Sequence, residues 1–171
     1  IYNPFNKSTV IKLSKKKLNK SIYKNDKTLK ILNVGRLVDQ KDHMTLLKAI
    51  KLVQNKIPIE VLIIGNGIKK NELQNYIYKN NLKKNVRVIS FKNNPYKYMQ
   101  KCELFILTSI YEGLPNVLLE AQCLKKFIIS TKCPTGPREI LMDGKVGHLF
   151  SPMNEIELSN KILDYYINKK K

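Results

Sequence analysis

Two glutamates with seven residues between them bracket a turn whose chemistry suits a phosphorylated sugar. Glu112 follows the apolar run 104–107, which is bounded like a buried strand, and Glu120 lies about one turn inside the next helix. Pro115 near the start of that helix costs little, because the amide it lacks would have no partner there. The free amides that follow, in 116–117, make a positive helix terminus suited to phosphate. Carboxylates before and after it can accept hydrogen bonds from sugar and ribose hydroxyls, as a nucleoside diphosphate sugar requires.

An isolated pair of this kind is more often a polar turn residue and a solvated helix position than a binding site. Here the match extends further, because the residues from Ser109 to Ala121 follow the pattern S-x-x-E-G-x-P-x-x-x-x-E-A. This stretch resembles the E-x7-E signature of the retaining family 4 glycosyltransferases.

A second match lies upstream, at 31–43, where an apolar strand leads into glycine, arginine and leucine. Gly35 allows the backbone to approach a ligand closely. Arg36 offers a planar fork of donors and Lys41 a point charge, and both suit a pyrophosphate. The two cations are alternatively explained as ordinary surface charges, although the chain has only three arginines.

The resemblance continues in a consistent order along nearly the whole chain. The segment 61–67 is similar to the family's strand and G-D-G turn, although its two glycines are explained equally well as plain turn residues. The segments 86–91 and 134–147 are similar to the strand before the base-binding loop and to a Gly-rich loop with its helix. Residues 2–4 are similar to the linker into the second domain of these enzymes. Asp42 departs from the pattern, because many relatives have glycine there.

Strand and helix signals alternate after residue 30. Strands are expected near 31–35, 60–64, 86–90, 104–107, 127–130 and 148–150, and helices near 43–55, 69–80, 94–101, 116–124, 137–142 and 154–168. The alternation predicts an α/β fold, a Rossmann-like doubly wound parallel sheet of about six strands, whose ligands bind beyond the carboxyl ends of the strands. The sequence lacks a G-x-G-x-x-G after the first strand, so a nicotinamide or flavin dinucleotide is not indicated.

The chain divides into a basic linker segment, 1–29, with a short helix near 8–19, and a Rossmann-like donor-binding domain, 30–171. Its 171 residues suffice for one well-buried core but not for two ordinary domains. The resemblance identifies it as one half of a GT-B fold, so we expect the acceptor-binding half to be missing and this fragment to be inactive alone.

The formal net charge of +19 suits a polyanion, but the lysines are scattered and accompany many Asn, Ile and Tyr residues, as an AT-rich genome produces. The scarcity of arginine argues against nucleic acid as a partner. We interpret the charge mainly as a solvated surface, with an anionic membrane surface as a secondary possibility. Without a signal peptide or an apolar run of membrane-spanning length, the expected location is cytoplasmic, or peripheral on the inner face of the plasma membrane.

The cysteines and histidines do not suggest a metal site. Cys102, Cys123 and Cys133 are odd in number and form no C-x-x-C, so reduced thiols are the simplest interpretation. His43 and His148 are too far apart in sequence to form a local metal pair.

The family resemblance implies retaining, metal-independent transfer of a hexose or N-acetylhexosamine from a nucleoside diphosphate sugar, commonly a UDP-sugar, to a cell-envelope or lipid-linked acceptor. It implies catalytic roles for Arg36, Lys41 and Glu112. The residues implied to bind the nucleotide sugar are Gly35, Arg36, Lys41, Glu112, Gly113, Leu114, Asn116, Val117 and Glu120. No cofactor is expected.

Other functions remain open at this stage. A GT-B epimerase would share the architecture, and so would a phosphorylase, although no lysine stands in a recognisable setting for pyridoxal phosphate. A non-catalytic module that binds a nucleotide or a lipid surface is a further alternative.

Overall fold

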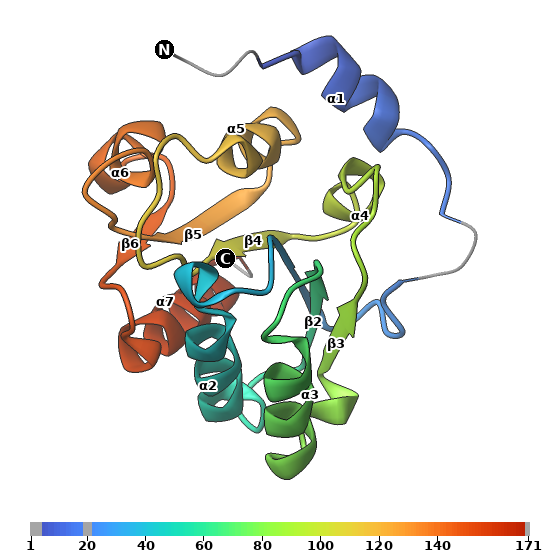
Figure 1. Cartoon of the computed structure of the whole chain (residues 1–171), viewed down its shortest axis with the longest axis vertical. Helices are drawn as coiled ribbons and strands as arrows, with labels where there is room; N and C mark the ends of the chain where they lie inside the picture. The colour runs from blue at the N-terminus through green and yellow to red at the C-terminus, as the bar shows by residue number, and fades with distance from the viewer. Residues whose placement is uncertain (1–4, 19–21, 170–171) are drawn as a thin grey trace.

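The computed structural model describes residues 5–18 and 22–169, which form a parallel six-stranded sheet between two layers of helices (Figure 1). Residues 2–4, the expected linker motif, lie outside the described residues. The strands are β1 Leu29–Val34, β2 Ile59–Ile64, β3 Val86–Ile89, β4 Leu104–Leu107, β5 Phe127–Thr131 and β6 His148–Phe150. Their order in the sheet is β3-β2-β1-β4-β5-β6, and all pairs are parallel. The predicted Rossmann-like fold and its six strands are confirmed.

The α-helices are α1 Lys7–Ser14, α2 His43–Val53, α3 Lys70–Lys79, α4 Tyr96–Met99, α5 Asn116–Cys123, α6 Pro137–Ile140 and α7 Glu155–Asn168. Short 3-10 turns lie at η1 Asp39–Lys41, η2 Leu82–Lys84 and η3 Met142–Gly144. Helices α2, α3 and α7 cover one face of the sheet, and α4, α5 and α6 cover the other. Helix α6 ends earlier than the expected residue 142, because Met142 has a φ of 49°, in the left-handed region, and cannot continue a right-handed helix.

Two hydrophobic cores result, one on each face of the sheet. The central strand β4 contributes to both, since Leu104 and Ile106 pack on the α2 side and Phe105 and Leu107 on the α5 side. All four side chains are buried. An uninterrupted apolar strand is therefore the pattern expected for a parallel sheet covered on both faces.

The strand order reverses between β1 and β4. The chain first builds outward from β1 through β2 to β3, and then crosses back to place β4 on the other side of β1. At such a switch point, the loops that leave the two neighbouring strands diverge in opposite directions and leave a crevice at their carboxyl ends. Here those loops carry the two motifs found in the sequence.

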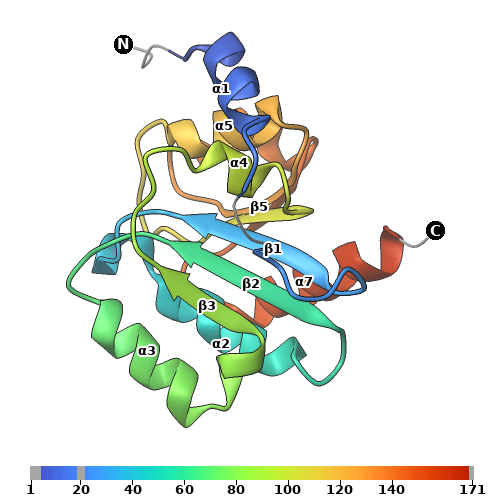
Figure 2. The ribbon, with the colours of Figure 1, turned by 90° about the vertical axis from the view of Figure 1, so that its right-hand side faces the viewer.

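Part of the segment before β1 packs against the domain. Helix α1 lies over α4 and α5, as Figure 2 shows, and its Val10 is buried. The Tyr23 hydroxyl donates a hydrogen bond to the Ile31 carbonyl at 3.0 Å. The buried Glu60 carboxylate accepts the backbone amides of 24–25, each at 2.9 Å. These contacts hold the segment on the sheet, while the proposed boundary at residue 30 stays a prediction.

Asp42 has a conformational reason for standing where many relatives have glycine. Its φ of 40° and ψ of 53° lie in the left-handed region, which glycine enters without penalty and which Asp tolerates better than most residues. Its side chain also caps α2, since it accepts hydrogen bonds from the Thr45 amide at 3.2 Å and from the Thr45 hydroxyl at 2.6 Å. Asp42 therefore offsets the cost of its backbone conformation with a helix cap.

We predict that Asp42→Ala destabilises the chain by about 1–2 kcal/mol, because alanine loses the cap and remains in the left-handed region. Asp42→Gly should stay within a few tenths of a kcal/mol of the original, since glycine loses the cap but relieves the backbone. Urea denaturation of the two variants, with Asp42→Asn as the variant that preserves both features, measures the difference. Equal losses for the alanine and glycine variants would contradict this explanation.

Candidate functional site

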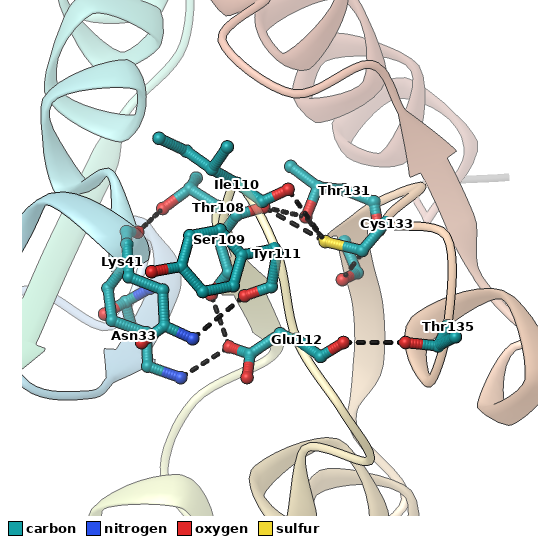
Figure 3. A network of polar contacts seen from close by, with 12 residues as sticks. Asn33, Lys41, Thr108, Ser109, Ile110, Tyr111, Glu112, Thr131, Cys133 and Thr135 are labelled. Atoms are coloured by element: carbon teal, nitrogen blue, oxygen red, sulfur yellow. Dashed lines mark hydrogen bonds and ion pairs between the residues drawn. The ribbon is translucent and has the colours of Figure 1, made fainter.

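The loops after β1 and β4 are joined to each other by hydrogen bonds to main-chain carbonyls. The Ile110 amide donates to the Gln40 carbonyl at 2.8 Å, and the Gln40 side-chain amide donates to the Tyr111 carbonyl at 2.9 Å. The Thr108 hydroxyl donates to the Lys41 carbonyl at 2.9 Å (Figure 3). Since these bonds fix one loop against the other, the side chains that the loops carry have defined relative positions.

The structure brings together two residues that sequence analysis selected from separate motifs. The Lys41 ammonium contacts the Glu112 carboxylate, although 71 positions separate them in the chain (Figure 3). The two side chains are only 17% and 8% exposed. The Ser109 hydroxyl donates to the same carboxylate oxygen at 2.5 Å. Two largely shielded charges, one from each motif, therefore neutralise each other.

The end of β5 and the loop that follows it donate hydrogen bonds to the loop that carries Glu112. The Thr131 hydroxyl donates to the Ser109 carbonyl at 2.6 Å, and the Cys133 thiol donates to it at 3.2 Å. The Thr135 hydroxyl donates to the Glu112 carbonyl at 2.7 Å (Figure 3). Burial raises the pKa of the Cys133 thiol, which keeps it protonated as a donor. Cys133 therefore has a structural role, as a donor that supports the Glu112 loop.

Three glycines let these loops approach one another closely. A side-chain carbon at Gly65 would lie 1.9 Å from the Gly35 carbonyl oxygen, and one at Gly67 would lie 2.2 Å from the Leu37 carbonyl oxygen. A carbon at Gly136, which has a φ of +69°, would lie 1.8 Å from the Gly113 carbonyl oxygen. Gly65 and Gly67 are thus required by close backbone packing against the β1 loop. The sequence alone could not distinguish this requirement from the role of plain turn residues.

Arg36 lies on the same β1 loop as Lys41 and is exposed. Within residues 5–18 and 22–169 it forms no ion pair, so its guanidinium is available to a ligand. Its neighbour Leu37 is fully buried, and the Leu37 amide donates to the Asn66 carbonyl at 2.8 Å. The exposed Arg36 side chain therefore extends from a backbone that Leu37 anchors in the core.

His43 lies buried next to Lys41 at the site. On sequence alone, this residue is excluded from a local metal pair and receives no other role. It is 2% exposed, and neither ring nitrogen has a hydrogen-bond partner among the described residues. Burial and the nearby Lys41 charge lower its pKa to about 4. The ring is therefore neutral at physiological pH and adds no positive charge beneath Lys41. No cluster of three or more metal-ligating side chains occurs in the described part of the chain.

Glu120 lies on α5, apart from the Lys41–Glu112 pair. Its half-buried carboxylate accepts a hydrogen bond from the Tyr96 hydroxyl at 3.1 Å, a partner that sequence analysis missed. Burial raises the pKa of Glu120, and the Tyr96 hydrogen bond partly offsets that effect. At the start of α5, the amides of Asn116 and Val117 precede the first helical bond, which Leu118 donates to the Pro115 carbonyl. First-turn amides have no partner inside a helix, so a phosphate can accept from them.

Comparisons with known proteins identify the family of this chain. A family model described as "Glycosyl transferases group 1" matches residues 14–171. An uncharacterised glycosyltransferase of Methanocaldococcus jannaschii is 43% identical over 111 residues, which are 64% of this chain and 27% of that protein. The N-acetylgalactosamine-N,N'-diacetylbacillosaminyl-diphospho-undecaprenol 4-alpha-N-acetylgalactosaminyltransferase of Campylobacter jejuni is 39% identical over 125 residues, which are 73% of this chain and 34% of that protein.

A solved structure shows the same architecture. The crystal structure of a TarM variant from S. aureus, in complex with fondaparinux, alpha-GlcNAc-glycerol and UDP, superposes with a TM-score of 0.76 at 25% identity. The match covers 86% of this chain and 30% of that one. This chain thus spans about a third of the length of the relatives that it matches.

The shielded Lys41–Glu112 pair generates a prediction about stability. Lys41→Met should destabilise the fold, because it leaves a largely buried carboxylate without its cation, and adding Glu112→Gln should recover part of the loss. We expect a coupling of about 1–3 kcal/mol from a double-mutant cycle measured by urea denaturation.

The exposed pair Lys48–Glu155, whose charged atoms are 4.0 Å apart, is the matched control. Its side chains are 47% and 33% exposed, so its coupling should stay below about 0.5 kcal/mol. Equal coupling in the two cycles would show that the Lys41–Glu112 pair is an ordinary surface contact.

Proposed function

Because this chain belongs to the glycosyl transferases group 1 family, we propose that it is the donor-binding part of a glycosyltransferase and holds a nucleoside diphosphate sugar where the β1 and β4 loops meet. The observation that carries the proposal is the Lys41–Glu112 contact at the strand-order reversal. It places a cation suited to a diphosphate directly beside a carboxylate suited to sugar hydroxyls. The proposed partner is an acceptor-binding domain of the same protein.

In this proposal the donor replaces the contacts that Lys41 and Glu112 make with each other. The diphosphate takes the Lys41 ammonium and the exposed Arg36 guanidinium, and the first amides of α5 donate to its remaining oxygens. Glu112, released from Lys41, accepts hydrogen bonds from the sugar hydroxyls. Glu120 accepts them from the ribose diol, so the two carboxylates have separate tasks.

Catalysis then depends on stabilising the negative charge that develops on the diphosphate as it leaves the sugar. The bond between the anomeric carbon and the diphosphate oxygen breaks, and its electron pair leaves with the diphosphate. The acceptor hydroxyl oxygen bonds to the anomeric carbon on the same face, and its proton passes to the departing phosphate. Arg36 and Lys41 stabilise the growing negative charge, which is the task that a metal ion performs in other transferases. Transfer is therefore proposed to be retaining and metal-independent.

The proposed donor is a UDP-sugar and the proposed acceptor a cell-envelope glycan or a lipid-linked sugar. The TarM variant at 25% identity was crystallised with UDP, and the Campylobacter jejuni relative is named for transfer to a diphospho-undecaprenol-linked sugar. That name specifies an alpha product, which retention produces from an alpha-configured donor. A non-catalytic nucleotide-binding module would use the same site, and sugar transfer by a chain that includes the acceptor-binding domain separates the two functions.

Nucleotide binding tests the proposal directly. Titration calorimetry with UDP, GDP and ADP in excess chelator should detect binding of one diphosphate, because Arg36, Lys41 and the α5 terminus supply the positive potential that a metal would supply. Glu120→Gln should weaken that binding by roughly tenfold, since a charged partner of the ribose is lost. Glu112→Gln should leave free diphosphate binding unchanged or improve it, because Lys41 is released, and should weaken the nucleotide sugar instead.

Two outcomes would contradict this assignment. Binding that appears only with Mg²⁺ or Mn²⁺ would show that the cations do not suffice. Equal loss of free UDP affinity in the two variants would show that the carboxylates do not divide sugar and ribose between them. Glu155→Gln, which removes the carboxylate of the exposed pair between α2 and α7, is the control for the change in net charge.

We also propose a peripheral association with anionic membranes. The supporting observation is a cluster of lysines at the end of α1, Lys15–Lys17, which lines a hollow of about 570 Å³ together with Lys101 and with Lys30, whose charge is paired with Asp26. Leu18 and Ile22 line the same hollow. In residues 5–18 and 22–169, no helix is long and apolar enough to cross a membrane. In this proposal attachment depends on charge, to which each lysine near an anionic bilayer contributes about 1 kcal/mol.

The chain should sediment with phosphatidylserine-containing vesicles at low salt and detach at high salt. Replacing Lys15, Lys16 and Lys17 with glutamine should reduce the bound fraction several-fold. The matched control replaces Lys79, Lys83 and Lys84, which are equally exposed near the end of α3 and cause the same change in net charge. Equal losses in the two triple variants would show that total charge, and not this cluster, determines binding.

A further inference from the structure

We infer that Tyr96 is a positioning residue that holds Glu120 for recognition of the ribose, and thereby makes the site select ribonucleotides over deoxyribonucleotides. The inference rests on the proposed function, because it assumes that Glu120 meets the ribose of a bound nucleotide. Beyond the proposed function, it gives a role to Tyr96 of α4 and predicts that the site distinguishes ribose from deoxyribose.

Tyr96 and Glu120 come from two helices that follow different strands. Tyr96 is the first residue of α4, which the loop after β3 leads into, and Glu120 lies on α5 after β4. The phenol donates to the Glu120 Oε1 atom at 3.1 Å. Both helices lie on the same face of the sheet, where the Tyr96 ring packs against the hydrophobic core. The hydrogen bond therefore joins the two loop systems at the carboxyl edge of the sheet.

The helix that carries the tyrosine is packed on both sides. Tyr98 and Met99, in the same short helix, are buried, and α1 packs across the helix from outside. The neighbouring Asn94 side chain donates to the Leu13 carbonyl of α1 at 2.9 Å, which fixes the loop just before the tyrosine. A donor on such a support orients the carboxylate that it contacts.

The Glu120 carboxylate has little other polar support. In the part of the chain that the structure describes, Tyr96 is its only hydrogen-bond donor. Burial and the adjacent carboxylate raise the pKa of Tyr96, so the phenol stays protonated and donates. One carboxylate offers about four lone-pair positions, and Tyr96 occupies one of them on Oε1. The remaining positions, fixed in orientation, are available to two vicinal hydroxyls.

A positioning role differs measurably from a merely structural one. If Tyr96 only stabilised the fold, removing its hydroxyl would weaken every nucleotide equally. If it orients Glu120 toward the ribose, the loss falls on ligands that have both ribose hydroxyls. The loss also disappears when Glu120 can no longer act as a charged acceptor.

The test is calorimetry with UDP, 2′-deoxy-UDP and 3′-deoxy-UDP against the unsubstituted chain, Tyr96→Phe, Glu120→Gln and the double variant. We expect the unsubstituted chain to prefer UDP over at least one deoxy analogue by about tenfold or more. Tyr96→Phe should lose about tenfold in UDP affinity and less than twofold for that deoxy analogue. In the Glu120→Gln background, Tyr96→Phe should cause no further loss.

Tyr98→Phe is the matched control, because it removes the same hydroxyl group two residues away in the same helix. It should leave the ratio of UDP to deoxy affinities unchanged, and thermal melts should show that both phenylalanine variants fold. An unchanged ratio in Tyr96→Phe, or an equal loss for all three ligands, would overturn the inference while nucleotide binding itself persists. Failure of the unsubstituted chain to bind UDP, GDP or ADP would instead overturn the proposed function, and this inference with it.

Discussion

The pairing of β1 with β4 is the constraint on which the rest of the site depends. Backbone pairing between these strands is short and ends with Leu32 opposite Phe105, whereas β1 stays paired with β2 up to Val34. One residue past Leu32, the buried Asn33 side chain donates to the Ile106 carbonyl at 2.8 Å. A side-chain amide thus takes the place of a ladder hydrogen bond, and β1 and β4 remain connected past the point where their backbones stop pairing. The two loops that leave here can diverge without exposing unpaired backbone in the core.

The loops beyond those strands are held mainly through main-chain carbonyls. The carbonyls of Gln40, Lys41, Ser109 and Glu112 each accept a hydrogen bond from a neighbouring loop. Close glycine contacts then leave the loops little room to shift. A site built in this way is largely formed before any ligand arrives, so a donor would lose little free energy in ordering it. The side chains that would touch the donor are the remaining adjustable parts.

Charge at the site is arranged differently from charge on the rest of the surface. Thirty-two basic residues against thirteen acidic ones give the surface a positive field that attracts anions of any kind. Where the β1 and β4 loops meet, however, the Lys41 ammonium is already matched by the shielded Glu112 carboxylate, and the nearby His43 is neutral. The general field therefore favours encounter with any polyanion, while the local pairing favours a ligand that brings both negative charge and hydroxyl groups.

Much of this protein is determined by the sequence alone. The positions of the six strands follow from apolar runs, because a parallel sheet covered on both faces needs uninterrupted hydrophobic strands. The edge of the sheet that carries Arg36, Lys41 and Glu112 follows too, since loops at the carboxyl ends of neighbouring parallel strands must share one rim. The tertiary structure alone decided that Lys41 pairs with Glu112 and that Tyr96 donates to Glu120. It also decided which glycines must be glycine. Each of these depends on ångström-scale distances between segments remote in the chain, and local patterns of residue type carry no information about such distances.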